Sequence, residues 1–183
     1  MTDSTPYQSV LTFWFEELEP AAWWKGSTQL DEQIRNQFGQ VLRQAAASEL
    51  DSWRESAQGR LAEIIVLDQF SRQVYRGQAA AFAQDPLALA LSQIAVASGA
   101  LAQLSTNQRV FLLMPWMHSE SRAIHERAVA LFAEHTPASN LDFEMRHKAI
   151  IDQFGRYPHR NAVLGRISSP QEIEFLKQPG SSF

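Results

Sequence analysis

FEMRHKAIIDQFGRYPHRNAVLGR, residues Phe143–Arg166, begins as an apolar helical pattern and ends in a cluster of polar side chains. Charged groups are rarely placed among Ile, Ala and Phe unless they are paired or functional. An earlier segment, Ile65–Gly77, reads IVLDQFSRQVYRG and carries much of the same pattern. We therefore expect the two segments to form the walls of one polar site.

The two segments are copies of one repeat. Asp68, Gln69, Phe70, Arg72 and Arg76 align without a gap on Asp152, Gln153, Phe154, Arg156 and Arg160. In the same register Asp85–Pro86 falls on Ser169–Pro170, so that a helix start follows each copy. The repeated unit, roughly residues 59–92 and 143–176, is predicted to be a helix, a polar loop and a second helix. Such helical hairpins pack side by side and leave a concave face.

The rest of the chain also has helical periodicity. Capping boxes are predicted where Ser105 precedes Gln108 and where Ser169 precedes Glu172. Pro115 is expected to kink or end its helix, with a restart at Ser119. No alternation typical of strands is present. The sequence predicts a single all-α domain over residues 1–183, with about eight helices joined by short connections.

Composition excludes several classes of protein. Hydrophobic residues make up 45% and charged residues 20%, which is ordinary for a globular domain. A net charge of −4 argues against nucleic-acid binding, and the absence of cysteine excludes disulfides and thiol nucleophiles. The polar N-terminus does not resemble a signal peptide, and we find no apolar run long enough to span a bilayer. We expect a soluble, cytoplasmic protein.

Arginine is concentrated in the two repeated segments. Asp68 and Arg72 lie four positions apart, as do Asp152 and Arg156, and each pair is predicted to be a buried, self-satisfied ion pair. Arg76 and Arg160 lie further from a local acid. Their planar guanidinium groups suit carboxylate or phosphate, so they are the better candidates for binding an anion.

Histidine supplies the candidates for acid–base chemistry. His118 and Glu120 follow Pro115, and the functional interpretation makes Glu120 the orienting partner of His118. The alternative is that Glu120 only caps a helix. His159 is a second acid–base candidate. Nucleophile and phosphate-loop motifs are absent. His147, His159 and Glu120 could join His118 as metal ligands, but no metal-site motif is present.

Other residues are assigned more simply. His125 and His135 are expected on an exposed helix face. Trp23 and Trp24 are expected to close a small core over a loop, and stacking against a ligand is the alternative. The predicted ligand-binding residues are Asp68, Gln69, Arg72, Arg76, His147, Arg156, Arg160 and Asn161, and the predicted catalytic residues are His118, Glu120 and His159.

Three motifs, DQFSRQVYRG, MPWMHSE and HKAIIDQFGRYPHRNAVLGR, resemble those of a bacterial family of proteins known only as a domain of unknown function. The resemblance covers nearly the whole chain and implies a tetratricopeptide (TPR)-like helical fold. The chain departs from the family pattern at Ser71, Gln73 and Val74, where a Pro-Arg-Asn pattern is expected. The resemblance implies no reaction.

These observations leave three functional hypotheses. The first is a binding module that holds an anionic small molecule or an acidic peptide in a pocket lined by Arg and His. The second is a hydrolase or lyase acting on an anionic substrate, with His118 or His159 as the acid–base group. The third is that the polar residues only hold the repeats together. The sequence names no cofactor, no ligand and no oligomeric state.

Overall fold

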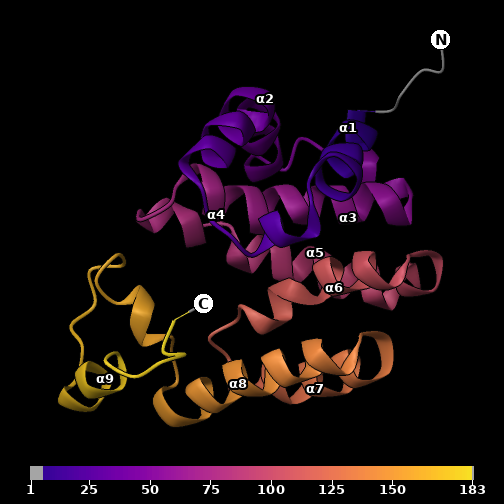
Figure 1. Cartoon of the computed structure of the whole chain (residues 1–183). Coiled ribbons are helices and arrows are strands. Elements are labelled where there is room, and N and C mark those ends of the chain that lie inside the picture. Colours follow the sequence, from indigo (N-terminus) through magenta and orange to yellow (C-terminus); the bar gives the residue numbers. More distant parts are fainter. Residues whose placement is uncertain (1–5, 183) are drawn as a thin grey trace.

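The protein is all-α in the computed structural model, which describes residues 6–182 (Figure 1). No strand occurs in that part of the chain, as the sequence predicts. The helices are α1 (Pro6–Thr12), α2 (Thr28–Ala46), α3 (Ala57–Ile65), α4 (Ser71–Val74), α5 (Asp85–Ala97), α6 (Thr106–Met117), α7 (Arg122–His135), α8 (Ala138–Phe154) and α9 (Pro170–Phe175). Segments Phe13–Glu17 and Val66–Phe70 are π-helical, and short 3₁₀ turns cover Pro20–Trp23, Asp51–Glu55, Ala79–Phe82, Ala100–Gln103 and Pro158–Arg160.

The helix starts follow the capping signals in the sequence. The side chain of Ser27 accepts a hydrogen bond from the backbone N–H of Leu30 at the start of α2. Both predicted capping boxes form, at the starts of α6 and α9. Gly155 ends α8 in the left-handed conformation that glycine adopts without strain. The sequence also predicts a helix cap at Thr5, and this residue lies outside the described residues.

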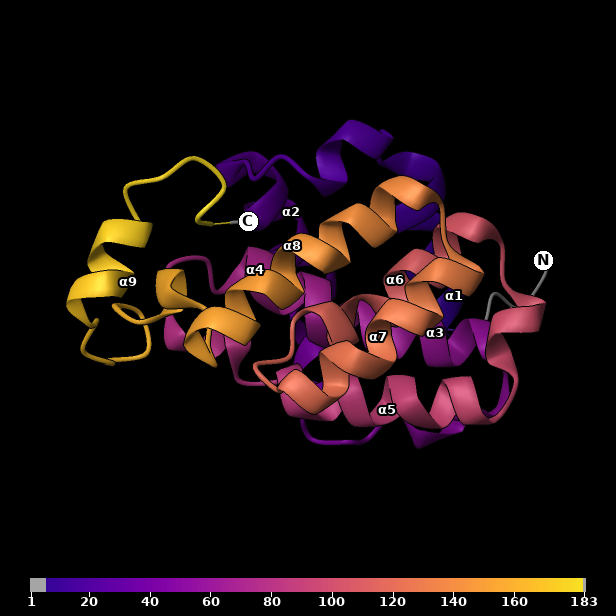
Figure 2. The ribbon, with the colours of Figure 1, turned by 90° about the horizontal axis from the view of Figure 1, so that it is seen from below.

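The helices are stacked around α3. This helix packs against α1, α5 and α6, while α6 also contacts α7, and α7 contacts α8. In Figure 1, α5 and α6 therefore lie between the α1–α4 group and the α7–α8 pair, and α9 stands to one side. The view from below in Figure 2 places α7 and α8 over the rest of the bundle. One apolar core runs from α1 to α7, and a smaller cluster holds Ile150, Ile151 and Tyr157.

Helices α3 and α4 are joined by the π-helical segment Val66–Phe70, so the chain stays helical from Ala57 to Val74. Ile64, Ile65, Val66 and Leu67 are fully buried, as expected for a helix that is apolar on all sides. A π-helical turn is rare, and such turns are frequent at functional sites. This one carries Asp68 and Gln69.

The sequence predicts that Pro115 kinks or ends its helix, and the structure shows that the helix does not end there. Helix α6 continues through Pro115 to Met117, and its C-cap is His118. The helix restarts at Arg122 rather than at Ser119. Pro115 is buried among the other side chains of α6, so packing holds the helical path where the proline N–H is missing.

In each copy of the repeat, an arginine binds an acidic side chain of the following helix. Arg72 makes two hydrogen bonds to Asp85, the first residue of α5, at 2.9 and 3.0 Å. Arg156 makes two to Glu172, within α9, at 2.6 and 2.8 Å. The aligned arginines therefore have the same role, although their acidic partners lie at different positions of the repeat.

One helical stretch, Ala79–Ala97, is long and apolar enough to cross a membrane by length and composition alone. This finding corrects our expectation that no apolar run in the sequence is long enough to span a bilayer. It includes α5, which packs against α3 and α6. A core helix of a globular protein meets the same criterion.

Candidate functional site

A cavity of about 480 Å³ opens between the repeated segments. Its walls come from the Trp pair, from the π-helical turn with α4, and from α6, α8 and the Pro158–Arg160 turn. We call it the central cavity. Its polar lining residues are Gln69, Arg72, Gln73, Arg76, His118, Asn140, His147, His159 and Arg160, and its larger apolar ones are Trp23, Trp24, Phe82, Met114, Met117, Phe143 and Tyr157.

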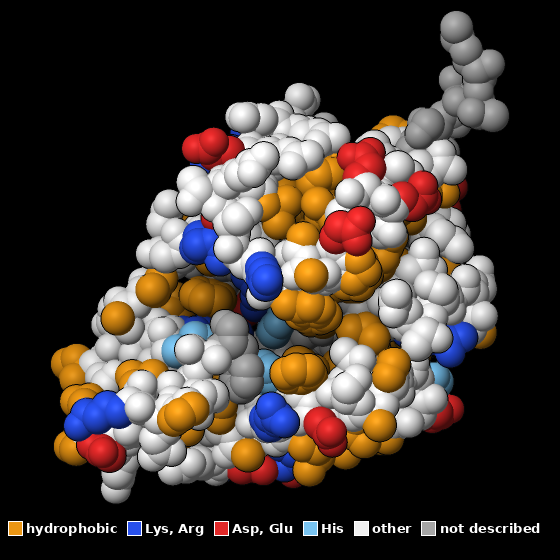
Figure 3. Space-filling model, in the orientation of Figure 1, with side chains coloured by type: hydrophobic (Ala, Val, Ile, Leu, Met, Phe, Trp, Pro, Cys, Tyr) orange, Lys and Arg blue, Asp and Glu red, His pale blue; other side chains and the backbone are white. Residues whose placement is uncertain are grey.

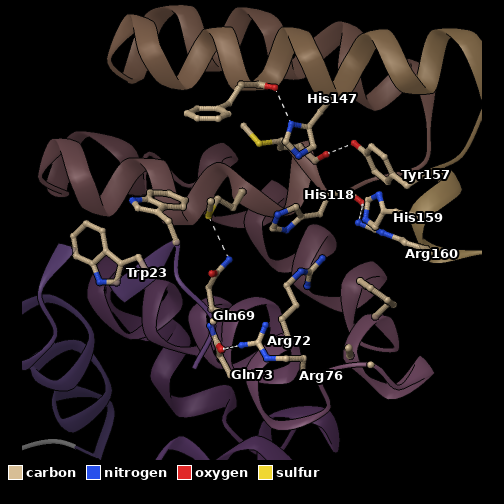
Figure 4. Close-up of a pocket in the computed structure, with 18 of the residues that line it drawn as sticks. Trp23, Gln69, Arg72, Gln73, Arg76, His118, His147, Tyr157, His159 and Arg160 are labelled. Atoms are coloured by element: carbon tan, nitrogen blue, oxygen red, sulfur yellow. Dashed lines mark hydrogen bonds between the residues drawn. The ribbon is translucent and has the colours of Figure 1, made fainter. Parts of the chain in front are cut away.

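The central cavity mixes apolar and basic surface. Figure 3 shows hydrophobic, basic and histidine side chains together around a hollow on one face of the molecule. In the close-up of Figure 4, His118, His147 and His159 lie across the cavity from Gln69, Arg72 and Arg76. The predicted residues Gln69, Arg72, Arg76, His118, His147, His159 and Arg160 are thus brought together, whereas Asp68, Glu120, Arg156 and Asn161 do not line the cavity.

Asp68 lies directly behind His118. Its Oδ1 is 2.7 Å from Nδ1 of His118, and its Oδ2 accepts a hydrogen bond from Nε2 of Gln69 at 2.6 Å. Burial alone would raise the pKa of Asp68, but the charge of Arg72 and the hydrogen bonds from His118 and Gln69 hold that pKa well below its usual range. Asp68 is therefore an ionised acceptor, and Nδ1 of His118 carries a proton.

His118 is neutral at pH 7 in this arrangement. Burial lowers the pKa of His118 and the charge of Arg72 lowers it further, while Asp68 opposes both. Since Nδ1 holds the proton, Nε2 has a lone pair. Within residues 6–182 no hydrogen bond to Nε2 of His118 is formed, and the residue lines the central cavity. The imidazole is therefore able to accept a proton there.

Arg72 and Arg160 share one carboxylate. Arg160 Nη1 donates to Asp85 Oδ2 at 3.1 Å, next to the two hydrogen bonds from Arg72. Arg72 also lies 3.2 Å from Asp68, so the predicted Asp68–Arg72 ion pair forms. The guanidinium of Arg160 lies 4.6 Å from the ring centres of both Phe82 and Tyr157, in cation–π contact. As the sequence indicates, Arg160 has no acidic partner nearby in the chain, and the partner that the fold provides is 75 positions away.

Arg76 also has a remote acidic partner. Its Nε and Nη2 donate to the carboxylate of Asp31 at 2.7 and 2.8 Å, and Nη2 makes a further contact with Gln73. The side chain of Arg76 is nevertheless 50% exposed. A Cβ atom on Gly26 would lie only 2.5 Å from Arg76 Nη1, so Gly26 leaves room for the guanidinium.

The ion pair predicted between Asp152 and Arg156 does not form. Asp152 is exposed and pairs with Lys148 at 2.6 Å, whereas Arg156 binds Glu172. Asn161 is buried and bonds Ser168 and Arg166 at 3.0 Å each. Arg156 and Asn161 are therefore structural residues of the C-terminal segment.

Glu120 does not orient His118, in contrast to the functional interpretation of the sequence. Its carboxylate binds Arg166 at 2.7 and 2.9 Å and accepts a hydrogen bond from the backbone N–H of Tyr157 at 2.8 Å. Asp68 takes the predicted role of Glu120. Because 50 positions separate Asp68 from His118, no local spacing could have indicated the pair.

His125 is fully buried, so its prediction as a surface residue is wrong. Its Nδ1 is 2.6 Å from Glu144 Oε1, and its Nε2 is 2.8 Å from the carbonyl oxygen of Ser119. The side chain of His135 is 24% exposed.

Burial lowers the pKa of His147 to about 3, and burial together with the charge of Arg160 lowers the pKa of His159 to about 4.

Two features complete the description of the site. Within residues 6–182 no group of three or more His, Asp or Glu side chains is placed to hold a metal ion. Trp23 packs on Phe15 and Phe111, as expected for a residue that closes a small core, and both Trp23 and Trp24 line the central cavity. Trp24 is 59% exposed.

Comparison with known proteins gives a family and a fold. The sequence profile of a bacterial protein of unknown function, DUF924, matches residues 10–180. A protein of unknown function from Agrobacterium tumefaciens has a solved structure similar to this one, with 33% sequence identity and a TM-score of 0.89 over 93% of this chain and 96% of that chain. No curated protein matches the sequence. The chain belongs to the DUF924 family of bacterial proteins of unknown function.

Proposed function

We propose that the protein binds a small organic anion with an apolar part in the central cavity. One observation carries the proposal: the ionisable side chains that line the cavity are arginine, histidine and tyrosine, and no Asp or Glu lines it within the described residues. Asp31, Asp68 and Asp85 instead contact the arginines and His118 from behind. A ligand would therefore face cationic and neutral groups.

The dimensions of the cavity support a small molecule. Ligand pockets commonly enclose about 300–1,000 Å³ and combine an apolar lining with a few fixed polar groups. Bidentate contacts with carboxylates hold Arg72 and Arg76 in place before any ligand arrives, which reduces the entropy lost on binding. Trp24 and Phe143 would contact the apolar part of the ligand.

Two fluorescent probes test the proposal. Anilinonaphthalene sulfonate is an aromatic anion, and N-phenylnaphthylamine is a similar molecule without the charge. We expect the wild type to bind the sulfonate more tightly than the neutral probe. Arg76→Gln should weaken sulfonate binding tenfold or more, because a hydrogen bond to a charged group contributes roughly 1.5–3 kcal/mol, and should leave binding of the neutral probe unchanged.

Arg54→Gln is the matched control. Arg54 also uses Nε and Nη2 to bind one carboxylate, that of Glu63 at 2.7 and 2.6 Å, but it does not line the cavity. The control should bind both probes as the wild type does. Equal affinity of the wild type for the two probes, or equal loss of sulfonate binding in both variants, would contradict the proposal.

A further inference from the structure

The surroundings of His118 in the central cavity indicate a chemical role that anion binding alone does not require. His118 lines the cavity, and Asp68, which is fully buried, holds its Nδ1 at 2.7 Å. A simple anion-binding histidine would present an N–H to the ligand. Here the N–H is directed at Asp68 instead, and the ring nitrogen without a hydrogen bond in the described residues is Nε2.

We propose that the central cavity is a hydrolytic active site, in which His118 is the general base that activates a water molecule against an ester bond of the bound organic anion. The inference rests on the proposed function, since the anion must first bind in the cavity. Asp68 is a positioning residue, because it acts through His118 and does not reach the reacting atoms.

The position of Asp68 is fixed from several sides. The residue lies on the π-helical turn Val66–Phe70, where the widened helix turn is a feature often found at functional sites. Gln69 donates to one carboxylate oxygen at 2.6 Å, and Arg72 lies 3.2 Å from the other. Gln69 is itself held by Sδ of Met114 at 3.3 Å. An acid held in this way keeps one tautomer and one orientation of His118.

The proposed step is balanced without any further reactant. Nε2 of His118 takes a proton from water as the water oxygen bonds to the carbonyl carbon of the ester. The negative charge that forms on the carbonyl oxygen lies in a cavity lined by basic and neutral groups, which favours it. The carbonyl then re-forms, the bond to the leaving oxygen breaks, and the leaving group takes the proton back from Nε2. The products are a carboxylic acid and an alcohol.

Water is the nucleophile because the cavity offers no side chain for this role. None of the residues that line it within the described part of the chain is Ser, Thr, Cys or Lys. The hydroxyl of Tyr157 donates to the carbonyl oxygen of Met117 at 2.5 Å, and burial raises its pKa. A covalent intermediate on the protein therefore has no candidate residue other than histidine.

The charges around His118 determine the expected pH dependence. The ionisable groups that face it or share its cavity are Asp68, Arg72, Arg76, Asp85, His147, Tyr157, His159 and Arg160. Because burial and Arg72 lower the pKa of His118, the active neutral form is present at pH 7. The rate should rise with pH to an inflection below the ordinary histidine value of about 6.5 and then remain constant.

Hydrolysis of para-nitrophenyl hemisuccinate, an aromatic ester that carries a carboxylate, tests the proposal in the full-length protein. His118→Gln should lower the enzymatic rate about a hundredfold or more, which is the usual contribution of a general base. His135→Gln, on a histidine outside the cavity, should leave the rate unchanged. Asp68→Asn should lower the plateau and shift the inflection to lower pH, a change that a purely structural role of Asp68 would not produce.

Labelling of the wild type with diethyl pyrocarbonate gives a test that needs neither catalysis nor a variant that folds. This reagent modifies neutral imidazoles. Mass spectrometry should show faster labelling of His118 than of His125, because both ring nitrogens of His125 are engaged and the residue is fully buried. Anilinonaphthalene sulfonate should protect His118.

The outcomes separate this inference from the proposed function. Binding of anilinonaphthalene sulfonate by the wild type tests the binding function, and hydrolysis by the wild type compared with His118→Gln tests the hydrolytic inference. If the wild type binds the sulfonate but hydrolyses the ester no faster than His118→Gln, the hydrolytic inference is overturned and the binding function stands. Labelling of His118 no faster than His125 would also overturn it. Failure of the wild type to bind the sulfonate would overturn both.

Discussion

Arg160 and Asp85 lie 75 positions apart in the chain, and Nη1 of Arg160 donates a hydrogen bond to Oδ2 of Asp85 at 3.1 Å. The same carboxylate binds Arg72 through two further hydrogen bonds. One acid at the start of α5 therefore joins Arg72 of the first repeated segment to Arg160 of the second. This contact holds together two walls of the central cavity.

Asp85→Ala should destabilise the protein strongly. The change leaves both Arg72 and Arg160 without their shared carboxylate, and the side chains of these arginines are only 20% and 7% exposed. Breaking a buried ion pair by removing one partner commonly costs about 3–5 kcal/mol. Urea unfolding followed by circular dichroism measures the loss. Glu174→Ala, which removes the exposed partner of Lys177, is the control and should cost less than about 1 kcal/mol.

The contact between Asp85 and Arg160 shows which part of the site could be predicted from the sequence. The polar repeat correctly indicated that Arg72 and Arg160 approach one cavity, because polar groups inside an apolar pattern need partners. It did not indicate the partners. Sequence spacing identifies neighbours on the same helix, such as Asp68 and Arg72, but Asp85 reaches Arg160 only through the tertiary fold.

The apolar residues that line the central cavity could not be predicted from the sequence, for a different reason. Phe82 and Met114 have the same helical spacing as residues of the core, so nothing in the sequence separates a lining residue from a packed one. The helices themselves were predictable, since capping residues and periodicity act locally. Pro115 is the exception, because packing of α6 maintains a helix that the local rule would end.

Glu144→Gln should be tolerated much better than Glu144→Ala. Burial raises the pKa of Glu144, against the opposing hydrogen bond from His125, which favours a neutral acid that donates to Nδ1 of His125. A glutamine N–H can make the same donation. We expect glutamine to cost under about 1 kcal/mol and alanine roughly 2–4 kcal/mol more, since alanine leaves a cavity and an unsatisfied imidazole. Equal losses of unfolding free energy for the two variants would show that the pair is ionic.

The stability of the protein should fall in acid partly because of His147. Burial lowers the pKa of His147 to about 3 in the folded state, whereas the unfolded chain has a value near 6.5. The unfolded state therefore binds the proton first, and the contribution of His147 is complete above about pH 6.5 and decreases as the pH falls toward 3. By pH 4 the decrease is roughly 3 kcal/mol.

Comparison with His147→Gln isolates this contribution, because the other titrating groups are common to both proteins. The difference in unfolding free energy between wild type and variant should become smaller from pH 7 to pH 4, as measured by urea unfolding at each pH. A difference that stays constant over this range would show that His147 titrates normally in the folded protein.

Gly26→Ala should weaken ligand binding without loss of stability, whereas Gly59→Ala should lower the stability of the protein. A Cβ on Gly26 would lie 2.5 Å from Arg76 Nη1, the end of a flexible side chain, so the guanidinium moves and the fold remains. We expect weaker binding of anilinonaphthalene sulfonate with an unchanged melting temperature. A Cβ on Gly59 would lie 2.0 Å from the backbone oxygen of Trp53, which is unable to move unless the Asp51–Glu55 turn shifts relative to α3. Gly59→Ala should therefore lose stability. Unaltered affinity of Gly26→Ala for the sulfonate would show that Arg76 takes no part in binding.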